Sequence, residues 1–328
     1  MIRNAKIVLV LLLLLPIHVF GQSTASEPPP SEGALFLLLP VGAEAVSLGR
    51  TMTAVRSTES AFWNPAGLSR LARTEFVVMR GDPLAGASTA LSWLISRQPI
   101  GVLGLSYHLL DGGEQPLVDD QQNVRGTISI RSHVGIVSVA TPLARWLDIG
   151  LNLKIVRFNL NCSGQCDDAG VQANGWAGDV GFQSQPLANL PLRFGAMLAH
   201  FGPRFQVVNA AQADPLPTRI RVSAAYEVLR HFSAPEDLSL WVRVEVEDRW
   251  KRLGESASFY VGTELVAGST NEIFLRASRA SGEINQTAEI AFGFGLRYEA
   301  FELALARSFA SSIVQGSEPV YVSFGIRF

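Results

Sequence analysis

The feature that most constrains this chain is a two-residue repeat of hydrophobicity, which recurs in segments of about ten residues from about residue 74 to the end. Residues 238–247 show it clearly, and segments 147–155, 219–228 and 289–298 alternate in the same way. In the first segment Leu238, Leu240, Val242, Val244 and Val246 alternate with Ser239, Trp241, Arg243, Glu245 and Glu247. Because successive residues of a strand point to opposite faces, each segment predicts a strand with one apolar face and one polar or small face.

About fourteen such segments can be placed, an even number. A soluble β-sandwich has the same two-residue period, so two further features are needed to distinguish it from a membrane β-barrel. The connections alternate in length, with long ones at 111–130, 158–173 and 202–217, and tryptophans are expected near strand ends, as in an aromatic girdle. These tryptophans are Trp93, Trp146, Trp176 and Trp250. The sequence therefore predicts an all-β fold, a transmembrane antiparallel β-barrel of about fourteen strands over residues 74–328, in the bacterial outer membrane.

The first residues have the composition of an export signal. Arg3 and Lys6 precede an apolar run over residues 7–15, and small residues follow it up to Gly21. A membrane-spanning helix needs roughly 20 apolar residues. Residues 1–21 are therefore predicted to be a cleaved signal peptide. Without them the formal charge is 25 − 29 = −4, too mild to indicate a nucleic-acid partner.

The last predicted strand ends at Phe328. A terminal strand ending in Phe resembles the signal by which the bacterial barrel assembly machinery recognises its clients, although the usual pattern has Gly at the position of Ser323 and often an aromatic at that of Ile326. The resemblance implies that this machinery and outer-membrane lipid are partners of the chain. The residues that would form the signal are Tyr321, Phe324, Ile326 and Phe328.

A barrel of this size needs something inside it. Eight strands fill their interior with side chains, whereas sixteen or more leave a water channel. Residues 22–73 are a mixed, helix-capable stretch with few charges, and we expect them to form a hatch inside the barrel. Charges of both signs on the polar strand faces, including paired carboxylates such as Glu245 and Glu247, predict ion pairs that line the lumen and hold this hatch; acid–base chemistry is the less favoured interpretation.

The segment "AFWNPAGLSRL" contains Trp63, Asn64, Pro65, Ala66 and Gly67, called the hatch motif below. Asn64 suits a helix N-cap and Pro65 the first helical position. Taken alone, this motif would indicate an ordinary capped turn. Together with "FLLLPVGAEAVSLG" it resembles the N-terminal region of the PorV/PorQ family of outer-membrane proteins, relatives of the FadL fatty-acid transporters. In place of that family's Gly-rich "GMGGA" the chain has Arg50, Thr51 and Met52.

This resemblance implies a fourteen-stranded barrel with an N-terminal hatch, and it implies two alternative functions. As a PorV/PorQ-type protein, the chain would be a type IX secretion accessory that binds secreted cargo proteins and secretion components, with contacts near 158–173 and 202–217. As a FadL-like protein, it would be a passive channel for hydrophobic small molecules, with an apolar pocket reaching from the outer loops to Asn64–Gly67. A purely structural barrel is a third possibility.

No residue pattern indicates catalysis, a metal or a cofactor, so the chain is not expected to be an enzyme. His108 shares the polar face of its strand and is predicted to be a lumenal packing residue. Cys162 and Cys166 are the only cysteines. In an exported protein they predict a disulfide; a metal site that also uses Asp167 and Asp168 is the alternative.

Overall fold

The computed structural model describes residues 32–83, 86–119, 121, 123–166, 170–186, 190–207, 213–232, 234–282, 289–310 and 318–328. The predicted signal peptide, residues 22–31 of the predicted hatch, and Asp167 and Asp168 lie outside the described residues. Within the described part of the chain, no helix combines the length and the apolar character needed to cross a bilayer.

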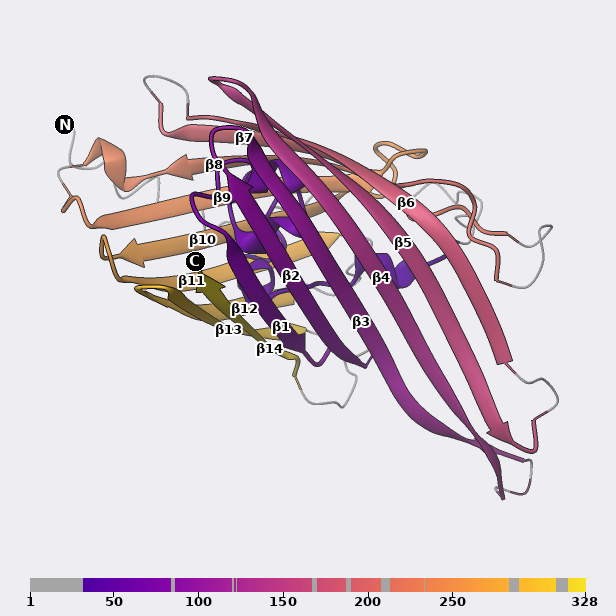
Figure 1. The fold of residues 1–328 in the computed structure, drawn as a ribbon. Helices are drawn as coiled ribbons and strands as arrows, with labels where there is room; N and C mark the ends of the chain where they lie inside the picture. The colour runs from indigo at the N-terminus through magenta and orange to yellow at the C-terminus, as the bar shows by residue number, and fades with distance from the viewer. Residues whose placement is uncertain are drawn as a thin grey trace. The chain divides into compact units, whose positions relative to one another are not determined.

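Fourteen antiparallel strands form one closed barrel, in which each strand pairs with its neighbours in sequence and β1 pairs with β14 (Figure 1). The strands are β1 (Glu75–Gly81), β2 (Ala87–Arg97), β3 (Gly101–Val118), β4 (Val124–Ala144), β5 (Leu147–Gly164), β6 (Gly170–Ser184), β7 (Leu192–Phe201), β8 (Arg219–Glu227), β9 (Leu238–Arg249), β10 (Ser258–Ala267), β11 (Glu272–Gly282), β12 (Glu289–Tyr298), β13 (Phe301–Ala310) and β14 (Val320–Arg327). Closure pairs the edge strands with each other, as the hydrocarbon layer requires. The predicted fold class is confirmed.

The alternation in the sequence separates the two faces of the wall. On β9, Val244 is 48% exposed on the exterior, whereas Glu245 is 2% exposed in the lumen. Likewise, Phe292 of β12 is exposed and the neighbouring Ala291 is buried. The apolar set of each segment therefore faces outward and the polar or small set faces inward.

Strands β3 to β6 are longer than expected, with 18, 21, 18 and 15 residues, and they run beyond the other strands at one end (Figure 1). We call this the extended end, and the opposite end, where β4 and β5 are joined by Arg145 and Trp146, the turn end. The prediction of long loops at 111–130 and 158–173 is therefore wrong, because most of these residues continue the ladder as strand. Trp93 of β2 and Trp176 of β6 lie inside strands rather than near their ends, although both are half-exposed on the exterior.

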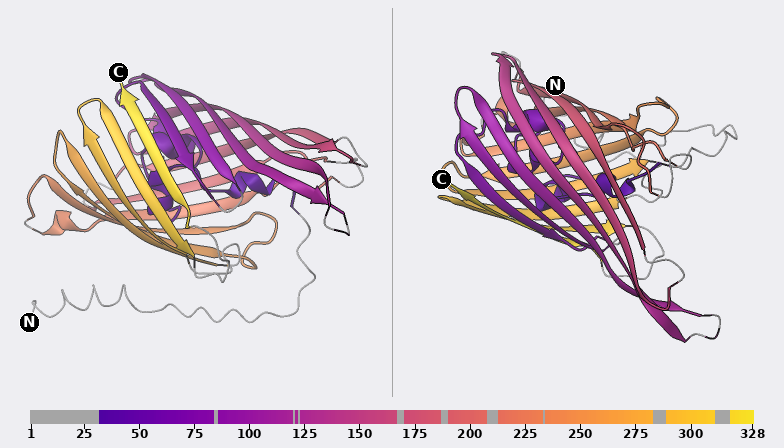
Figure 2. Two further views of the ribbon diagram at one scale, coloured as in Figure 1. Left: turned by 90° about the horizontal axis from the view of Figure 1, so that it is seen from below. Right: turned by 45° about the vertical axis from the view of Figure 1, so that its right-hand side comes forward.

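Residues 32–73 form four short helical elements: η1 (Leu35–Leu38), α2 (Ala43–Ser47), η2 (Thr58–Ala61) and η3 (Pro65–Leu68). Helix α2 contacts β12 and β13, whereas η3 contacts β4, β5 and β6 on the other side of the barrel. The segment therefore crosses the lumen, and its indigo coils lie within the ring of strands in both views of Figure 2.

Candidate functional site

The hatch motif is attached to the barrel wall through Asn64, which is fully buried. Its Oδ1 accepts a hydrogen bond from the Ala66 amide at 3.1 Å, the N-cap bond of η3. Its Nδ2 donates to the carbonyl oxygens of Thr53, at 2.6 Å, and Phe182, at 3.1 Å. Since Phe182 belongs to β6, one side chain caps the helix, joins two parts of the hatch and holds the hatch against the wall.

A wall glycine allows this approach. A Cβ built on Gly181 of β6 would lie 1.8 Å from Asn64 Oδ1, so no larger residue fits without displacing the motif. Within the motif, a Cβ on Gly67 would lie 2.4 Å from the Val55 carbonyl oxygen. Pro65 is the first residue of η3, where its missing N–H is not needed, and both Pro65 and Ala66 are buried.

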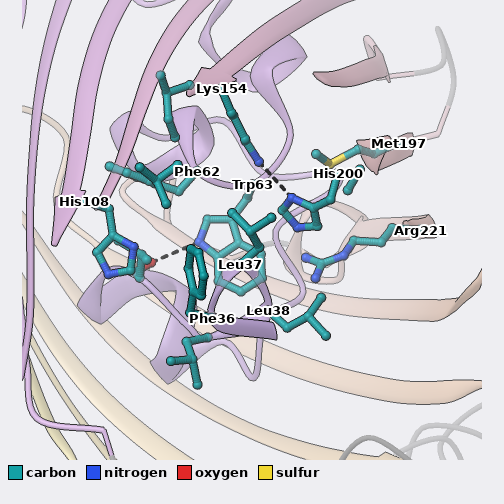
Figure 3. A pocket seen from close by; sticks show the side chains of 15 residues that line it. Phe36, Leu37, Leu38, Phe62, Trp63, His108, Lys154, Met197, His200 and Arg221 are labelled. Atoms are coloured by element: carbon teal, nitrogen blue, oxygen red, sulfur yellow. Dashed lines mark hydrogen bonds between the residues drawn. The ribbon is translucent and has the colours of Figure 1, made fainter. Parts of the chain in front are cut away.

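Trp63 forms the floor of an internal cavity. Its Nε1 donates to the Val41 carbonyl oxygen at 3.0 Å, and it belongs to a buried apolar cluster with Ala45, Leu48 and Met52. The guanidinium carbon of Arg221 lies 4.9 Å from the ring centroid, a cation–π contact that comes from β8. Trp63 is thereby fixed by both the hatch and the wall, and Figure 3 shows it among the side chains that line the cavity, with His108 and His200 on opposite sides.

This cavity has a volume of about 30 Å³. Since one water needs about 10–15 Å³, it has room for water but not for a ligand of ordinary size. Side chains of η1, including Phe36, Leu37 and Leu38, occupy the space next to Trp63 (Figure 3). The remaining lining is mostly apolar, with a few polar groups on the wall: Leu39, Val41, Phe62, His108, Val134, Ile136, Lys154, Met197, Ala199, His200 and Arg221.

One side of the cavity carries a buried polar cluster from three neighbouring strands. Lys154 Nζ of β5 lies 2.6 Å from Asp179 Oδ2 of β6 and 3.1 Å from His200 Nδ1 of β7. The His200 amide donates to Asp179 Oδ1 at 2.9 Å, next to a register irregularity between β6 and β7. His200 has φ of 57°, which turns its backbone out of the regular ladder. The cluster is internally paired, as buried charges must be.

His108 lies across the cavity from this cluster. It points into the lumen, is 5% exposed, and its Nε2 is 2.9 Å from Ser88 Oγ. Its predicted position in the lumen is therefore confirmed. Within the described residues, no three His, Cys, Asp or Glu side chains gather as a metal site.

Carboxylates fasten the rest of the hatch. Glu245 of β9 accepts hydrogen bonds from the Thr53 amide, at 2.9 Å, and the Thr53 hydroxyl, at 2.8 Å. Glu59 accepts from the Ala45 amide at 2.8 Å and from Ser323 Oγ of β14 at 2.7 Å. Burial, and secondarily the nearby Glu44 carboxylate, raises the pKa of Glu59 to about 7.

Ion pairs between hatch and wall complete the attachment, and they confirm that the lumenal charges hold the hatch. Because these pairs are largely buried, we expect them to fix the position of the hatch more than to add net stability. They are Glu32 with Arg219, Glu44 with Arg276, Arg50 with Glu289, and Arg56 and Arg70 with Asp148.

The other predicted site residues lie away from the cavity. Cys162 and Cys166 are joined by a disulfide at the extended end of β5. On β14, Tyr321 is buried in the lumen and Phe324 faces outward, stacked on Phe301. Ile326 is half-buried, and Phe328 is 72% exposed just beyond the strand.

Comparisons with known proteins bear on the fold. No protein-family model matches the sequence, and a search of curated proteins finds no match. Among solved structures, the chain is similar to the CymD monoaromatic hydrocarbon channel, with 14% identity, a TM-score of 0.59, and coverage of 91% of this chain and 99% of that one. The Pseudomonas putida toluene transporter TodX gives 11% identity, a TM-score of 0.56, and coverage of 87% and 96%. A Pseudomonas aeruginosa FadL homologue gives 9% identity, a TM-score of 0.51, and coverage of 88% and 98%.

The fold is that of FadL-type outer-membrane barrels. The expected outer-membrane location agrees with this fold and with the apolar exterior. At such low identities the similarity concerns the fold alone, so the predicted PorV/PorQ relationship stays a prediction. CymD is described as a channel and TodX as a transporter.

Sequence reasoning selected the hatch motif but missed most of the cavity. Lys154 and Asp179 belong to the charged residues of the polar strand faces, but nothing in the sequence indicated that His200 lies beside them or that Met197 lines the same cavity. The run "LFLL" of η1 was part of the resemblance, yet its apolar character does not say which cavity it enters. Glu59 carried no signal, because its partners lie on α2 and β14, distant in sequence.

Proposed function

We propose that this protein is a passive outer-membrane channel for small hydrophobic molecules, with η1 lying in the path of the ligand. The observation that carries the proposal is the mostly apolar cavity between η1 and the hatch motif, inside a lumen that is otherwise crossed by ion pairs and hydrogen bonds. Transfer of apolar surface out of water contributes roughly 25 cal/mol per Å². Paired charges offer no such gain to a hydrophobic solute, so the cavity is the favourable place for it.

Occupation of the cavity requires η1 to move. The free volume of about 30 Å³ is far below the roughly 300–1,000 Å³ of ligand pockets. Helix η1 has no side-chain cap, and Leu35 is 55% exposed. If Phe36 and Leu37 leave the cavity, their apolar contacts are replaced by those of an apolar ligand, and few directional bonds are lost.

The similar structures support this function over the other one predicted from the sequence. CymD and TodX are described as channels or transporters for monoaromatic hydrocarbons or toluene. The channel interpretation predicts an apolar pocket that reaches from the outer loops to Asn64–Gly67. The cavity extends only as far as Trp63, the residue before Asn64, and in the described conformation it is nearly filled. None of these three neighbours is described as a secretion component, so the predicted role with secreted cargo gains no support from them.

Uptake measurements test the proposal. The assay uses cells whose cytoplasmic enzymes convert the imported compound into a form that stays inside the cell. In these cells, expression of the barrel should increase the initial uptake rate of a labelled monoaromatic hydrocarbon. A labelled long-chain fatty acid, tested in parallel, shows which class of compound is carried. The substitution Leu37→Trp fills the cavity and should reduce uptake several-fold. Leu35→Trp, on the exposed side of η1, is the matched control and should leave uptake unchanged. The proposal is refuted if neither compound enters cells with the barrel faster than cells without it. It is also refuted if the sole effect of deleting the protein is a defect in protein secretion.

A further inference from the structure

The exterior of β4 and β5 changes from apolar to polar at one level. Reading from the turn end to the extended end, the outward residues of β4 are Val139, Val137, Gly135, His133 and Arg131, and their cross-strand partners on β5 are Leu151, Leu153, Ile155, Arg157 and Asn159. Outer-membrane barrels have an apolar band bounded by polar residues at its edges. The edge of the hydrocarbon layer on these strands therefore lies between the pair Gly135–Ile155 and the pair His133–Arg157.

A groove begins at this edge and runs into the apolar band. Its volume is about 360 Å³. It exists because Gly135 leaves the exterior without a side chain: a Cβ built there meets no atom within 4 Å. Tyr107 of β3 and Ile155 of β5 flank the gap. The lining is Phe76, Leu91, Trp93, Leu105, Ser106, Tyr107, Gly135, Ile136, Val137, Leu153 and Ile155.

A cation without a carboxylate partner lies directly beyond the groove. Arg157 is exposed, and its Nε donates to Asn159 Oδ1 at 3.2 Å. Among the residues that the structure describes, none of the acidic groups forms an ion pair with it, whereas Arg131 is paired with Asp111 at 3.0 Å. Beside Arg157, His133 Nδ1 lies 2.7 Å from Tyr107 Oη, so the polar edge is joined to the wall of the groove.

We propose that this exterior site binds a membrane lipid with an anionic headgroup, whose acyl chain lies in the Gly135 groove and whose headgroup phosphate contacts Arg157. The groove lies within the lipid-facing band, so its occupant is in the membrane rather than in water. A guanidinium binds phosphate oxygens through charge-assisted hydrogen bonds, and at the edge of the hydrocarbon layer this interaction is less screened than in bulk water. The site is independent of the proposed channel function.

Two variants separate the two halves of the site. Native mass spectrometry of the purified full barrel, titrated with phosphatidylglycerol or phosphatidylcholine, gives the binding constants. Wild type should bind phosphatidylglycerol about tenfold more tightly, since one charge-assisted bond is involved. Arg157→Gln should abolish the preference for phosphatidylglycerol. Gly135→Leu should weaken the binding of both lipids and leave the ratio of their binding constants unchanged. Arg307→Gln removes an exposed cation from β13 and should change neither the binding constants nor their ratio.

Retained headgroup preference in Arg157→Gln, or unchanged binding in Gly135→Leu, would overturn the proposal. Release of the lipid by millimolar inorganic phosphate would also overturn it, because it would indicate an anion site without a chain groove. Heat-dependent migration on a denaturing gel checks that each variant is folded. In wild-type protein, acyl-brominated phosphatidylglycerol should quench the part of the fluorescence that Trp93→Phe removes; absence of quenching would count against the site even if a variant failed to fold.

Discussion

Replacing Asn64 tests whether the hatch motif holds the hatch against the wall. In Asn64→Ala three hydrogen bonds disappear: the cap bond from Ala66, and the bonds donated to the carbonyls of Thr53 and Phe182. The cap contributes about 1 kcal/mol, and each of the other two bonds about 1 kcal/mol. The Thr53 carbonyl keeps a long bond from Gln183 Nε2 at 3.4 Å, which offsets part of the loss. We therefore expect residues 53–68 to lose about 2–3 kcal/mol of local stability.

Hydrogen–deuterium exchange on the folded barrel measures this change directly. Amides of residues 53–68 should exchange faster by about 30- to 150-fold, which corresponds to 2–3 kcal/mol, while the wall strands β10 and β11 keep their protection. Asn64→Asp discriminates between the two roles of the side chain. The carboxylate keeps the cap bond, so the Ala66 amide stays protected, but it places an acceptor against two carbonyl oxygens, so the rest of the motif is released.

Asn161→Ala serves as the control, because Asn161 is exposed on β5. The reasoning is refuted if Asn64→Ala leaves exchange within residues 53–68 as slow as in wild type, or if the Ala66 amide is equally protected in the Ala and Asp variants.

Three further outcomes are expected. Gly181→Ala should displace the motif and accelerate hatch exchange, because its Cβ would lie 1.8 Å from Asn64 Oδ1, whereas Gly135→Ala, with nothing within 4 Å, should be neutral; equal effects would contradict the close-approach argument. Burial raises the pKa of Glu59 from its ordinary 4.5 to about 7, so the folded hatch holds this proton more tightly than the unfolded chain. Hatch stability should then fall as pH rises from about 4.5 to 7, and Glu59→Gln should flatten that exchange-measured slope. Cys162→Ser should lower the unfolding free energy by at most about 2 kcal/mol in urea titrations, because the closed loop is short.

The strand pattern was predictable because residues that face lipid must be apolar, whereas the alternate residues, which face the lumen, are polar or small. Segment 238–247 was expected to alternate, and β9 covers Leu238–Arg249 with Glu245 inside and Val244 outside. The extended ends of β3 and β4 were not predictable in this way. Beyond Asp111 and Arg131 both faces of these strands meet polar surroundings. The alternation of apolar and polar residues is therefore lost, and the sequence of the strand resembles that of a loop.

The cavity was less predictable for a different reason. Asn64 and Pro65 carry local information, since a cap and a first helical position depend on near neighbours. The contact of Lys154 with His200 depends on the register of three strands and on the irregularity between β6 and β7. Such a register is fixed by the closed barrel as a whole, and no short motif reports it.

The two parts of the hatch are attached by different kinds of contact, and this determines which part can respond to a ligand. Residues 43–68 are held by directional bonds from opposite walls, such as Ala43 to Ser323 Oγ at 2.8 Å and Thr53 to Glu245. Breaking such a bond without replacement leaves a buried polar group unsatisfied, at a cost of about 1–3 kcal/mol. The side chains of η1 that enter the cavity, in contrast, make apolar contacts that a hydrophobic ligand can replace with similar area. If the protein is a channel as proposed, entry of a ligand would therefore displace η1 before it displaces the hatch motif. It follows that Leu37→Trp should change uptake without faster exchange in residues 53–68, whereas Asn64→Ala should change exchange there first.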